Sequence, residues 1–290
     1  MKQRELIDNT CLLLIKQGYA VKSMTRSCFD LLARQGRKIL LIKAVEDAKS
    51  LDKETMDEMI KVADYLSGSP IIIAEKAGFI LERNIVYSKH SIYTMNLDTF
   101  ANSVMNRMPY IKSSKAGATV QLSGDMLRKK REELGYSLTE LAARLGVSRN
   151  MVQRYESGNS EITIQRAVRM TDQLGKEVFR RIDIFSRHAP IIAHIPGKGD
   201  ISKKYFTLGF DSEETKRSPF DIIARKKDRL ILTGVGDKVN PNARKVSELL
   251  DADNLMIYKK KRPKDLPSMK KKEFLEIEKA KELMKFLKEF

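Results

Sequence analysis

One stretch of this sequence occurs twice. Residues 26–47 are RSCFDLLARQGRKILLIKAVED, and residues 217–238 are RSPFDIIARKKDRLILTGVGDK. The two stretches align without a gap at an offset of 191 residues, and a weaker match at a shifted offset follows between 62–74 and 246–258. Because only two copies occur and a different segment separates them, the sequence predicts two related domains around a third, and not a solenoid.

Both copies have the pattern of a mixed α/β unit. The runs KILLIKAV (38–45) and SPIIIA (69–74) are rich in Ile and Leu, which is typical of strands buried on both faces. The segments QGR (35–37) and KKD (226–228) predict hairpin tips. A helix between the two apolar runs implies a parallel crossover. We therefore expect helix, turn, extended Phe-Asp segment, hairpin, strand, helix and strand in each copy.

Residues between the copies have helical periodicity and sharp capping signals. Ser137 and Glu140 predict a capping box at the start of one short helix, which Gly146 ends. Ser148 predicts the start of the next helix. Two short helices joined by LGVS follow the helix-turn-helix plan, in which the second helix enters the major groove of DNA. Residues 176–185 (KEVFRRIDIF) are expected to extend the last helix of this segment.

The expected recognition helix carries polar side chains of the types that bind DNA. Arg149, Asn150 and Gln153 are the expected base-reading residues, since Arg pairs with guanine and Asn or Gln with adenine. A net charge of +17 also favours a polyanionic partner. The expected phosphate contacts are Lys129, Lys130, Ser137, Thr139, Arg144, Ser148 and Arg154.

The middle segment resembles a known class of DNA-binding domain. SLTELAARLGVSRNMVQRYESGNSEIT, from Ser137 on, has the Ser that starts helix two, the LA..LGVS turn and the YE.G ending of Cro/CI-type helix-turn-helix domains. The resemblance covers about a fifth of the chain. It implies a helical domain that binds double-stranded DNA.

The flanking copies resemble the PD-(D/E)XK nuclease fold. In that family an Asp and a second acid hold Mg²⁺, and a Lys two residues after the acid assists the attacking water. Asp30 and Lys43 match the first Asp and the Lys, but Leu41 stands at the position of the second acid. In the other copy Asp221 remains, with Leu232 and Gly234 at the remaining two positions. These replacements predict no catalytic residue, no metal, no cofactor and no enzyme activity.

A structural role for the two aspartates is the competing interpretation. Asp30 and Asp221 would each tie down a turn or pair with the nearby Arg34 or Arg225. Replacing Asp30 by Asn should then reduce stability. A Mg²⁺-dependent endonuclease targeted by the helix-turn-helix stays open as an alternative function, as does a DNA-repair or chromatin factor without sequence preference.

The whole layout resembles a family of archaeal transcriptional regulators with a nuclease-like domain before a Cro/CI-type helix-turn-helix. The expected fold class is α/β plus all-α, with two related restriction-endonuclease-like α/β domains flanking the helical bundle. The resemblance implies a cytoplasmic regulator, and we expect a homodimer on a pseudo-palindromic operator. The expected domains and linkers are 1–108 (nuclease-like), 109–123 (linker), 124–185 (helix-turn-helix), 186–200 (linker) and 201–290 (second nuclease-like domain).

The remaining signals exclude several classes of protein. No apolar run reaches the length of a membrane span, so no membrane partner is expected. Cys11 and Cys28 have no metal-ligand spacing with the three histidines. The sequence identifies neither the operator nor a small-molecule effector, although it leaves room for one in the flanking domains.

Overall fold

The chain forms two structural units. The computed structural model describes residues 2–25, 27–114, 117–158, 160–186, 197–263 and 265–289. One unit contains residues 1–74, 90–92 and 185–290, and the other contains 75–89 and 93–184. The expected linker over 186–200 lies largely outside the described residues.

The first unit contains both repeated copies. Its N-terminal copy has the strand order β1-β2-β3-β4, and its C-terminal copy has the order β10-β11-β12-β13-β14. The N-terminal copy consists of α1 (Gln3–Lys16), β1 (Ala20–Ser23), β2 (Leu31–Gln35), β3 (Lys38–Asp47), the 3₁₀ turn η1 (Ala48–Ser50), α2 (Lys53–Leu66) and β4 (Ser69–Lys76). The C-terminal copy consists of α8 (Asp200–Thr207), β10 (Asp211–Glu214), β11 (Ile222–Lys226), β12 (Arg229–Val235), α9 (Pro241–Leu250), β13 (Asp253–Tyr258), β14 (Ser268–Lys270), α10 (Lys271–Glu276) and α11 (Ala280–Lys288).

The two copies share the same hairpin and the same register. Gln35 pairs with Lys38 in one copy, and Lys226 pairs with Arg229 in the other, so both predicted hairpin tips are confirmed. Both tips use a left-handed residue in a two-residue turn, and Lys227 takes a φ of 54° there. The crossover through α9 joins the parallel strands β12 and β13, as expected for a βαβ unit.

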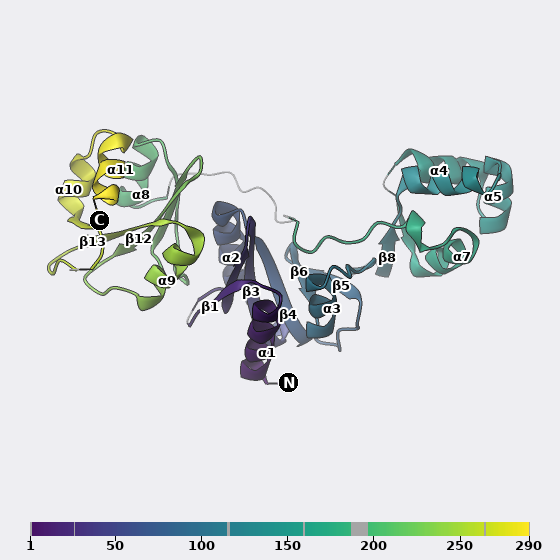
Figure 1. Cartoon of the computed structure of the whole chain (residues 1–290), viewed down its shortest axis with the longest axis horizontal. Helices are drawn as coiled ribbons and strands as arrows, with labels where there is room; N and C mark the ends of the chain where they lie inside the picture. Colours follow the sequence, from purple (N-terminus) through teal and green to yellow (C-terminus); the bar gives the residue numbers. More distant parts are fainter. Residues whose placement is uncertain are drawn as a thin grey trace. The chain divides into compact units, whose positions relative to one another are not determined.

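Aromatic side chains fill the core of the C-terminal copy. The ring of Tyr205 lies 4.9 Å from that of Phe274 and 5.7 Å from that of Phe210, measured between centroids. Its buried hydroxyl is 2.7 Å from the Thr233 hydroxyl, which satisfies both polar groups. In Figure 1, α8, α10 and α11 cover one side of β12 and β13, and α9 covers the other. Each copy is therefore a small layered α/β domain.

The second unit contains the central helices and several strands. Its strands follow the order β6-β5-β7-β8-β9. Its elements are β5 (Ile85–Lys89), β6 (Ile92–Met95), α3 (Leu97–Val104), β7 (Ile111–Ser114), β8 (Gly117–Gln121), α4 (Gly124–Glu133), α5 (Leu138–Leu145), α6 (Arg149–Ser157), β9 (Glu161–Thr163), α7 (Ile164–Leu174) and the 3₁₀ turn η2 (Lys176–Val178).

Two local expectations differ from the structure. The stretch expected as a linker over 109–123 contains β7 and β8, and β8 pairs with β9, so it is built into the sheet. The helix α7 does not continue through 176–185, because it ends at Leu174 and Gly175 turns the chain with a φ of 80°. The C-terminal segment forms two helices, α10 and α11, separated by extended backbone at 277–279.

Candidate nucleic-acid interface

The turn between α5 and α6 is set by local hydrogen bonds. The Ser137 hydroxyl accepts from the Glu140 amide at 3.1 Å, and the Glu140 carboxylate accepts from the Ser137 amide at 2.7 Å. These bonds lower the pKa of Glu140. Gly146 ends α5 in the left-handed region, and the Ser148 hydroxyl caps α6 by accepting from the Met151 amide at 3.2 Å. The predicted capping box and both helix boundaries are confirmed.

The inner face of α6 packs into the core of the domain. Val152 and Tyr155 are buried there, together with Leu141 and Leu145 of α5. At Gly124 the start of α4 lies so close to α6 that a Cβ atom would come within 2.5 Å of the Glu156 carbonyl oxygen. This close approach fixes the position of α6 against the first helix.

A buried ion pair also joins α4 to α6. Arg131 donates through Nε to Glu156 Oε1 at 2.6 Å and through Nη2 to Oε2 at 3.1 Å. The same guanidinium donates to the Tyr136 carbonyl oxygen at 3.0 Å. The carboxylate of Glu156 raises the pKa of Arg131. Sequence reasoning missed this pair, because nothing in the spacing of Arg131 and Glu156 shows that they meet.

The outer face of α6 carries the expected DNA-binding side chains. Arg149, Asn150, Gln153 and Arg154 are all exposed. Their side chains make no hydrogen bond or ion pair with the residues that the structure describes. The three expected base-reading residues thus share one helix and the solvent-facing side of that helix.

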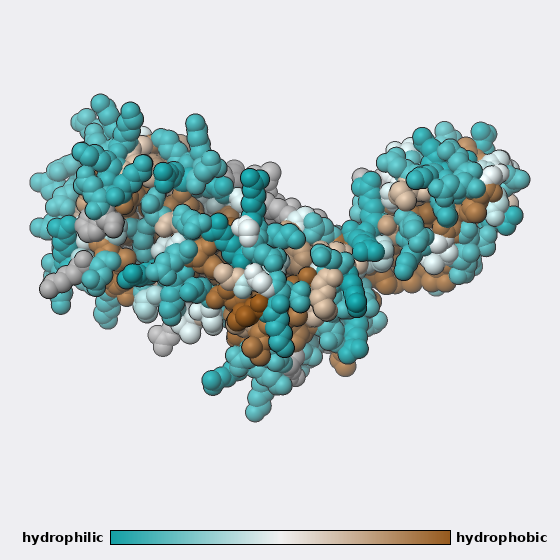
Figure 2. Space-filling view, in the orientation of Figure 1, coloured by the Kyte–Doolittle hydropathy of each residue, from teal (hydrophilic) through white to brown (hydrophobic). Residues whose placement is uncertain are grey.

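The expected phosphate contacts lie on α4, α5 and their caps. Thr139 and Lys129 are exposed, whereas Lys130 contacts Glu133 at 3.3 Å. The Arg144 guanidinium stacks over the Tyr136 ring at 4.3 Å from its centroid, so its orientation is already restricted. Hydrophilic residues gather over α4 in the face shown in Figure 2.

Three apolar residues of the helix-turn-helix domain do not enter its core. Met126, Leu134 and Val168 are 40%, 41% and 55% exposed. The neighbouring Leu127 is fully buried in place of Met126. The buried face of α4 therefore includes Leu127 and leaves Met126 outside the core.

The nuclease-like residues of the N-terminal copy form a closed pair. Asp30 accepts from Lys43 Nζ at 2.9 Å through Oδ1 and from the Ala44 amide at 2.9 Å through Oδ2. Leu41 is fully buried in the core. The side chains of Asp30 and Lys43 are 12% and 14% exposed, so each shields the other from water. The Asp30 carboxylate therefore has a structural contact with the next strand, β3, but it does not pair with Arg34.

The C-terminal copy retains half of this arrangement. Asp221 accepts from the Val235 amide at 2.6 Å, which is the bond that Asp30 makes in the other copy. Gly234 replaces the lysine, and Arg225 contacts other groups. The expected pairing of each aspartate with its arginine is wrong, because each carboxylate turns toward the next strand. Across the described ranges, no three His, Cys, Asp or Glu side chains are grouped to hold a metal ion.

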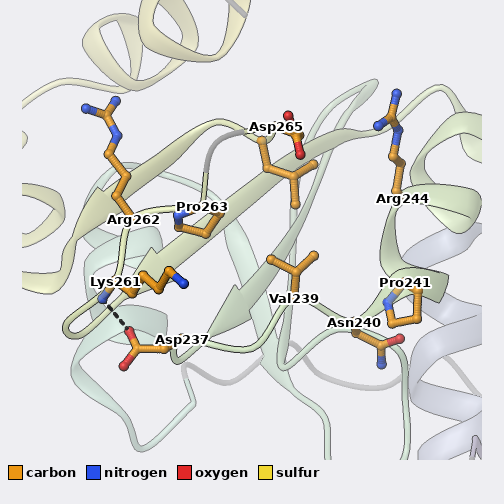
Figure 3. A pocket seen from close by; sticks show the side chains of 10 residues that line it. Asp237, Val239, Asn240, Pro241, Arg244, Lys261, Arg262, Pro263 and Asp265 are labelled. Carbon is orange, nitrogen blue, oxygen red and sulfur yellow. Dashed lines mark hydrogen bonds between the residues drawn. The ribbon is translucent and has the colours of Figure 1, made fainter.

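A cavity of about 630 Å³ lies at the carboxyl ends of β12 and β13 in the C-terminal copy. The Asp237 carboxylate holds its basic loop by accepting from the amides of Lys259, Lys260 and Lys261 at 2.8–3.3 Å, which lowers the pKa of Asp237. In Figure 3, Arg262 and Arg244 stand on opposite sides of this hollow. Apolar side chains, including Val239, complete the lining.

Helices in the described part of the chain are too short or too polar to span a membrane.

Comparisons with known proteins match two parts of the chain to family models. Residues 3–110 match a PD-(D/E)XK superfamily domain, and residues 127–179 match a helix-turn-helix model. These are the regions in which sequence analysis placed the N-terminal nuclease-like fold and the DNA-binding helices.

Relatives from archaea match the chain over nearly its full length. One from Archaeoglobus fulgidus is 31% identical over 98% of this chain and 97% of its own. Those from Pyrococcus furiosus and Methanocaldococcus jannaschii are 28% and 27% identical, over 92% and 99% of this chain and 91% and 98% of their own. All three carry the provisional name of HTH-type transcriptional regulatory protein. The chain therefore belongs to this family of archaeal HTH-type transcriptional regulatory proteins.

Proposed function

We propose that this protein is a sequence-specific regulator of transcription that binds double-stranded DNA through a Cro/CI-type helix-turn-helix. The observation that carries the proposal is the outer face of α6. Its polar side chains are exposed and have no partner among the described residues, whereas its inner face is fixed by the core and by the Arg131–Glu156 pair. A rigid helix with an unsatisfied polar face suits the major groove.

In this proposal α6 supplies the sequence specificity. Arg149 would pair with a guanine edge, and Asn150 and Gln153 with adenine. Each base-reading residue is expected to contribute about 1–3 kcal/mol of discrimination against the wrong base.

Residues around α4, α5 and the start of α6 would hold the DNA backbone. The cap hydroxyls of Ser137 and Ser148 accept from backbone amides, so their O–H groups are free to donate to phosphate oxygens. The cationic contacts would be Lys129, Lys130, Arg144 and Arg154, with Thr139 as a further hydroxyl donor.

Regulation would follow from occupancy of a promoter. One recognition helix covers about half a site, so a homodimer would place two helices about 34 Å apart on a pseudo-palindromic operator. Bound there, the dimer would block or assist the transcription machinery in the cytoplasm. Sedimentation of the protein alone and with a two-fold duplex tests the stoichiometry of two chains for each site.

Two alternatives are each favoured by one observation. The Asp30–Lys43 pair, within the PD-(D/E)XK match, favours a Mg²⁺-dependent endonuclease. The buried Leu41 at the position of the second acid argues against it. The net charge of +17 alone would equally serve a repair or chromatin factor without sequence preference. Cleavage of duplex DNA in Mg²⁺ that stops in Lys43→Ala would establish the first alternative.

The basic cavity beside Asp237 is the candidate place for a small-molecule effector. Its lining is partly apolar, and its three cations, Lys261, Arg244 and Arg262, outnumber the two carboxylates of Asp237 and Asp265, so the cavity suits a small anion with an apolar part. A rise in melting temperature with such a compound, absent in Arg262→Ala, would support this role. An unchanged melting temperature across a panel of phosphorylated and carboxylated metabolites would remove it.

The proposed function is tested by competition between DNA sequences. Genomic fragments that the protein retains are first narrowed to one short duplex by footprinting. Binding of that duplex and of a scrambled duplex is then compared for the wild type, Asn150→Ala and Arg166→Ala, an exposed α7 control. We expect the preference for the footprinted duplex to fall about tenfold or more in Asn150→Ala only. Equal binding of both duplexes by the wild type would refute sequence-specific regulation.

A further inference from the structure

An arginine of the N-terminal copy holds the end of a helix in the C-terminal copy. Arg34 Nη1 donates to the Leu249 carbonyl oxygen at 2.8 Å and to Asp251 Oδ2 at 2.6 Å. Both acceptors lie at the carboxyl end of α9, where carbonyl groups lack helical partners and the helix dipole favours a cation. The Arg34 Nε donates to the Gly36 carbonyl oxygen at 3.1 Å within its own hairpin, which orients the guanidinium.

The C-terminal copy makes the same contact in the opposite direction. Arg225 Nη1 donates to the Tyr65 carbonyl oxygen at 2.8 Å and to the Ser67 hydroxyl at 2.5 Å, at the carboxyl end of α2. Arg225 Nε donates to the Lys227 carbonyl oxygen at 3.1 Å in its own hairpin. The acceptor has changed from a carboxylate to a hydroxyl, but the position has not.

These two contacts join equivalent residues of the repeat. Arg225 lies 191 residues after Arg34, the offset of the hairpins. In the helices α2 and α9, equivalent residues lie 184 positions apart, so Ser67 is the equivalent of Asp251. Both of these residues cap their helix in the left-handed region, with φ values of 52° and 54°. The arginine of each copy thus contacts the same helix end of the other copy. Such a reciprocal contact between equivalent residues is characteristic of an isologous two-fold interface.

A second contact between the copies is also reciprocal. The Asn242 side chain, near the start of α9, donates to the Thr25 hydroxyl at 3.5 Å. At the equivalent place on α2, Glu58 accepts from the Lys216 amide at 3.0 Å and from the Arg217 amide at 2.6 Å. The helix of each copy thus packs against the segment that precedes β2 or β11 of the other copy.

The two RSxFD segments meet between these contacts. The Cys28 amide donates to the Arg217 carbonyl oxygen at 2.5 Å. The Cys28 thiol lies 3.7 Å from the Ser218 hydroxyl. Ser218 also donates to Glu58 at 3.2 Å. The most similar part of the repeat is therefore the part that lies at the interface between its two copies.

We propose that the repeated surface is a homotypic dimerisation face, and that the C-terminal copy is the built-in partner of the N-terminal copy. The surface consists of Arg34, Thr25, Cys28, Glu58 and Ser67, with their repeat equivalents. The chain then contains a fused two-fold dimer of nuclease-like domains. Because each chain occupies this face itself, the homodimer proposed above must form through a different surface.

Charge pairs at the rim favour pairing within one chain over pairing of like copies. Lys61 contacts Glu213 at 2.7 Å. Two N-terminal copies brought together by the same face would set Lys61 against Lys22, the repeat equivalent of Glu213. Such like-charge contact disfavours the wrong partner.

The second rim contact has the same effect on the C-terminal copy. Arg217 contacts Asp52 at 3.0 Å and Glu54 at 3.3 Å. Two C-terminal copies paired by this face would set Arg217 against Lys238, the equivalent of Glu54. Each copy therefore fits the other copy better than it fits itself.

Cross-linking of the full chain tests this pairing. A Ser218→Cys change in a Cys11→Ser background leaves two thiols, whose sulfur positions lie within reach of a disulfide after small side-chain rotations. With oxidised glutathione at pH 8.5 we expect one disulfide within each chain, identified by mass of the peptide pair containing residues 28 and 218. The thiolate introduced at position 218 first displaces one glutathione thiolate from oxidised glutathione, and the Cys28 thiolate then displaces the second to close the disulfide. Burial raises the pKa of Cys28 to about 12, so this second step is slow and a long incubation is needed.

A matched control carries Ser50→Cys, an exposed position in η1 of the same copy, and should form no bond with Cys28. Two free thiols in a folded Ser218→Cys chain would overturn the proposal. A disulfide that joins two chains would overturn it as well, because the partner would then be another molecule. If Ser218→Cys does not fold, Lys61→Cys with Glu213→Cys and a short bismaleimide spacer gives the same readout at the half-buried rim.

Discussion

The helix-turn-helix and the flanking copies use their polar side chains in opposite ways. On α6, Arg149, Asn150 and Gln153 face solvent without a partner among the described residues. In the flanking copies, the recurring Arg34 and Arg225 bind helix ends of the other copy. A polar residue that recurs in a repeat can thus serve the pairing of the two copies, whereas a polar face that the fold leaves unsatisfied is available for a ligand.

The same contrast separates two kinds of ion pair. Asp30 and Lys43 neutralise each other at the place where a nuclease would bind Mg²⁺. Arg131 and Glu156 neutralise each other behind α6, where their pairing positions a binding surface. The first pair lies within the nuclease-like domain, and the second supports a proposed binding surface. Changes at the two pairs should therefore differ in their effect on DNA binding.

The largest effect is expected from Arg131→Met. It leaves the buried Glu156 carboxylate without its main partner, which should reduce the free energy of unfolding of the helix-turn-helix by about 3 kcal/mol. Urea unfolding followed by circular dichroism measures the loss, and DNA affinity should fall with it. The double variant Arg131→Met with Glu156→Leu should recover most of the stability, because no unpaired charge remains. A single variant as stable as wild type would contradict the positioning role.

Asp30→Asn should cost about 2 kcal/mol, because the ammonium of Lys43 loses its counter-charge while an amide oxygen still accepts from Ala44. Asp221→Asn, at an exposed position without a lysine, should cost about 0.5 kcal/mol. Adding Lys43→Met to Asp30→Asn should restore stability. Neither change should alter DNA specificity. Unchanged stability of Asp30→Asn with loss of DNA cleavage would instead support the nuclease alternative.

Lys129→Ala should weaken DNA binding by about 1 kcal/mol or less, and equally for all sequences. Removal of one phosphate contact should reduce the slope of log K against log salt by about 0.9. Anisotropy titrations at several salt concentrations measure this slope. Lys272→Ala, an exposed lysine of the C-terminal copy, is the matched control and should leave the slope unchanged. A change of base preference in Lys129→Ala would contradict the assignment of Lys129 to a phosphate contact that is independent of sequence.

The smallest effect concerns Asp52, whose contribution to the stability of the first unit depends on pH. Hydrogen bonds from the Thr55 amide and then from Arg217 lower the pKa of Asp52 to about 2. A depressed carboxyl pKa stabilises the folded state above the unfolded value of about 3.9, and this contribution disappears as the pH falls through 2. Stability of the first unit should therefore fall between about pH 4 and pH 2, and less so in Asp52→Asn. Identical pH profiles for the two proteins would show that Asp52 keeps neither the Thr55 nor the Arg217 hydrogen bond in solution.

Sequence reasoning located the elements that depend on local signals. Ser137, Gly146 and Ser148 mark their helix ends because capping uses neighbours in the chain. The repeat predicted both hairpins and the parallel crossover, because strand patterns survive divergence.

Contacts between residues far apart in the chain were not predictable in this way. Arg34 and Arg225 were assigned to the adjacent aspartates, whereas each bridges more than 150 residues to the other copy. The Arg131–Glu156 pair and the pairing of β8 with β9 were missed for the same reason. The exposed face of α6 was predictable, because helical periodicity decides which residues turn inward.

Selection of bound duplexes from a random DNA pool in Mg²⁺, with Gln153→Ala selected in parallel, tests the central claim most directly. The wild type should recover an intact two-fold motif, and the variant should recover the same motif relaxed at one position of each half-site. That result would establish sequence-specific binding by α6. Recovery without any motif, or recovery of cut DNA, would contradict the account and indicate that the flanking domains carry the function.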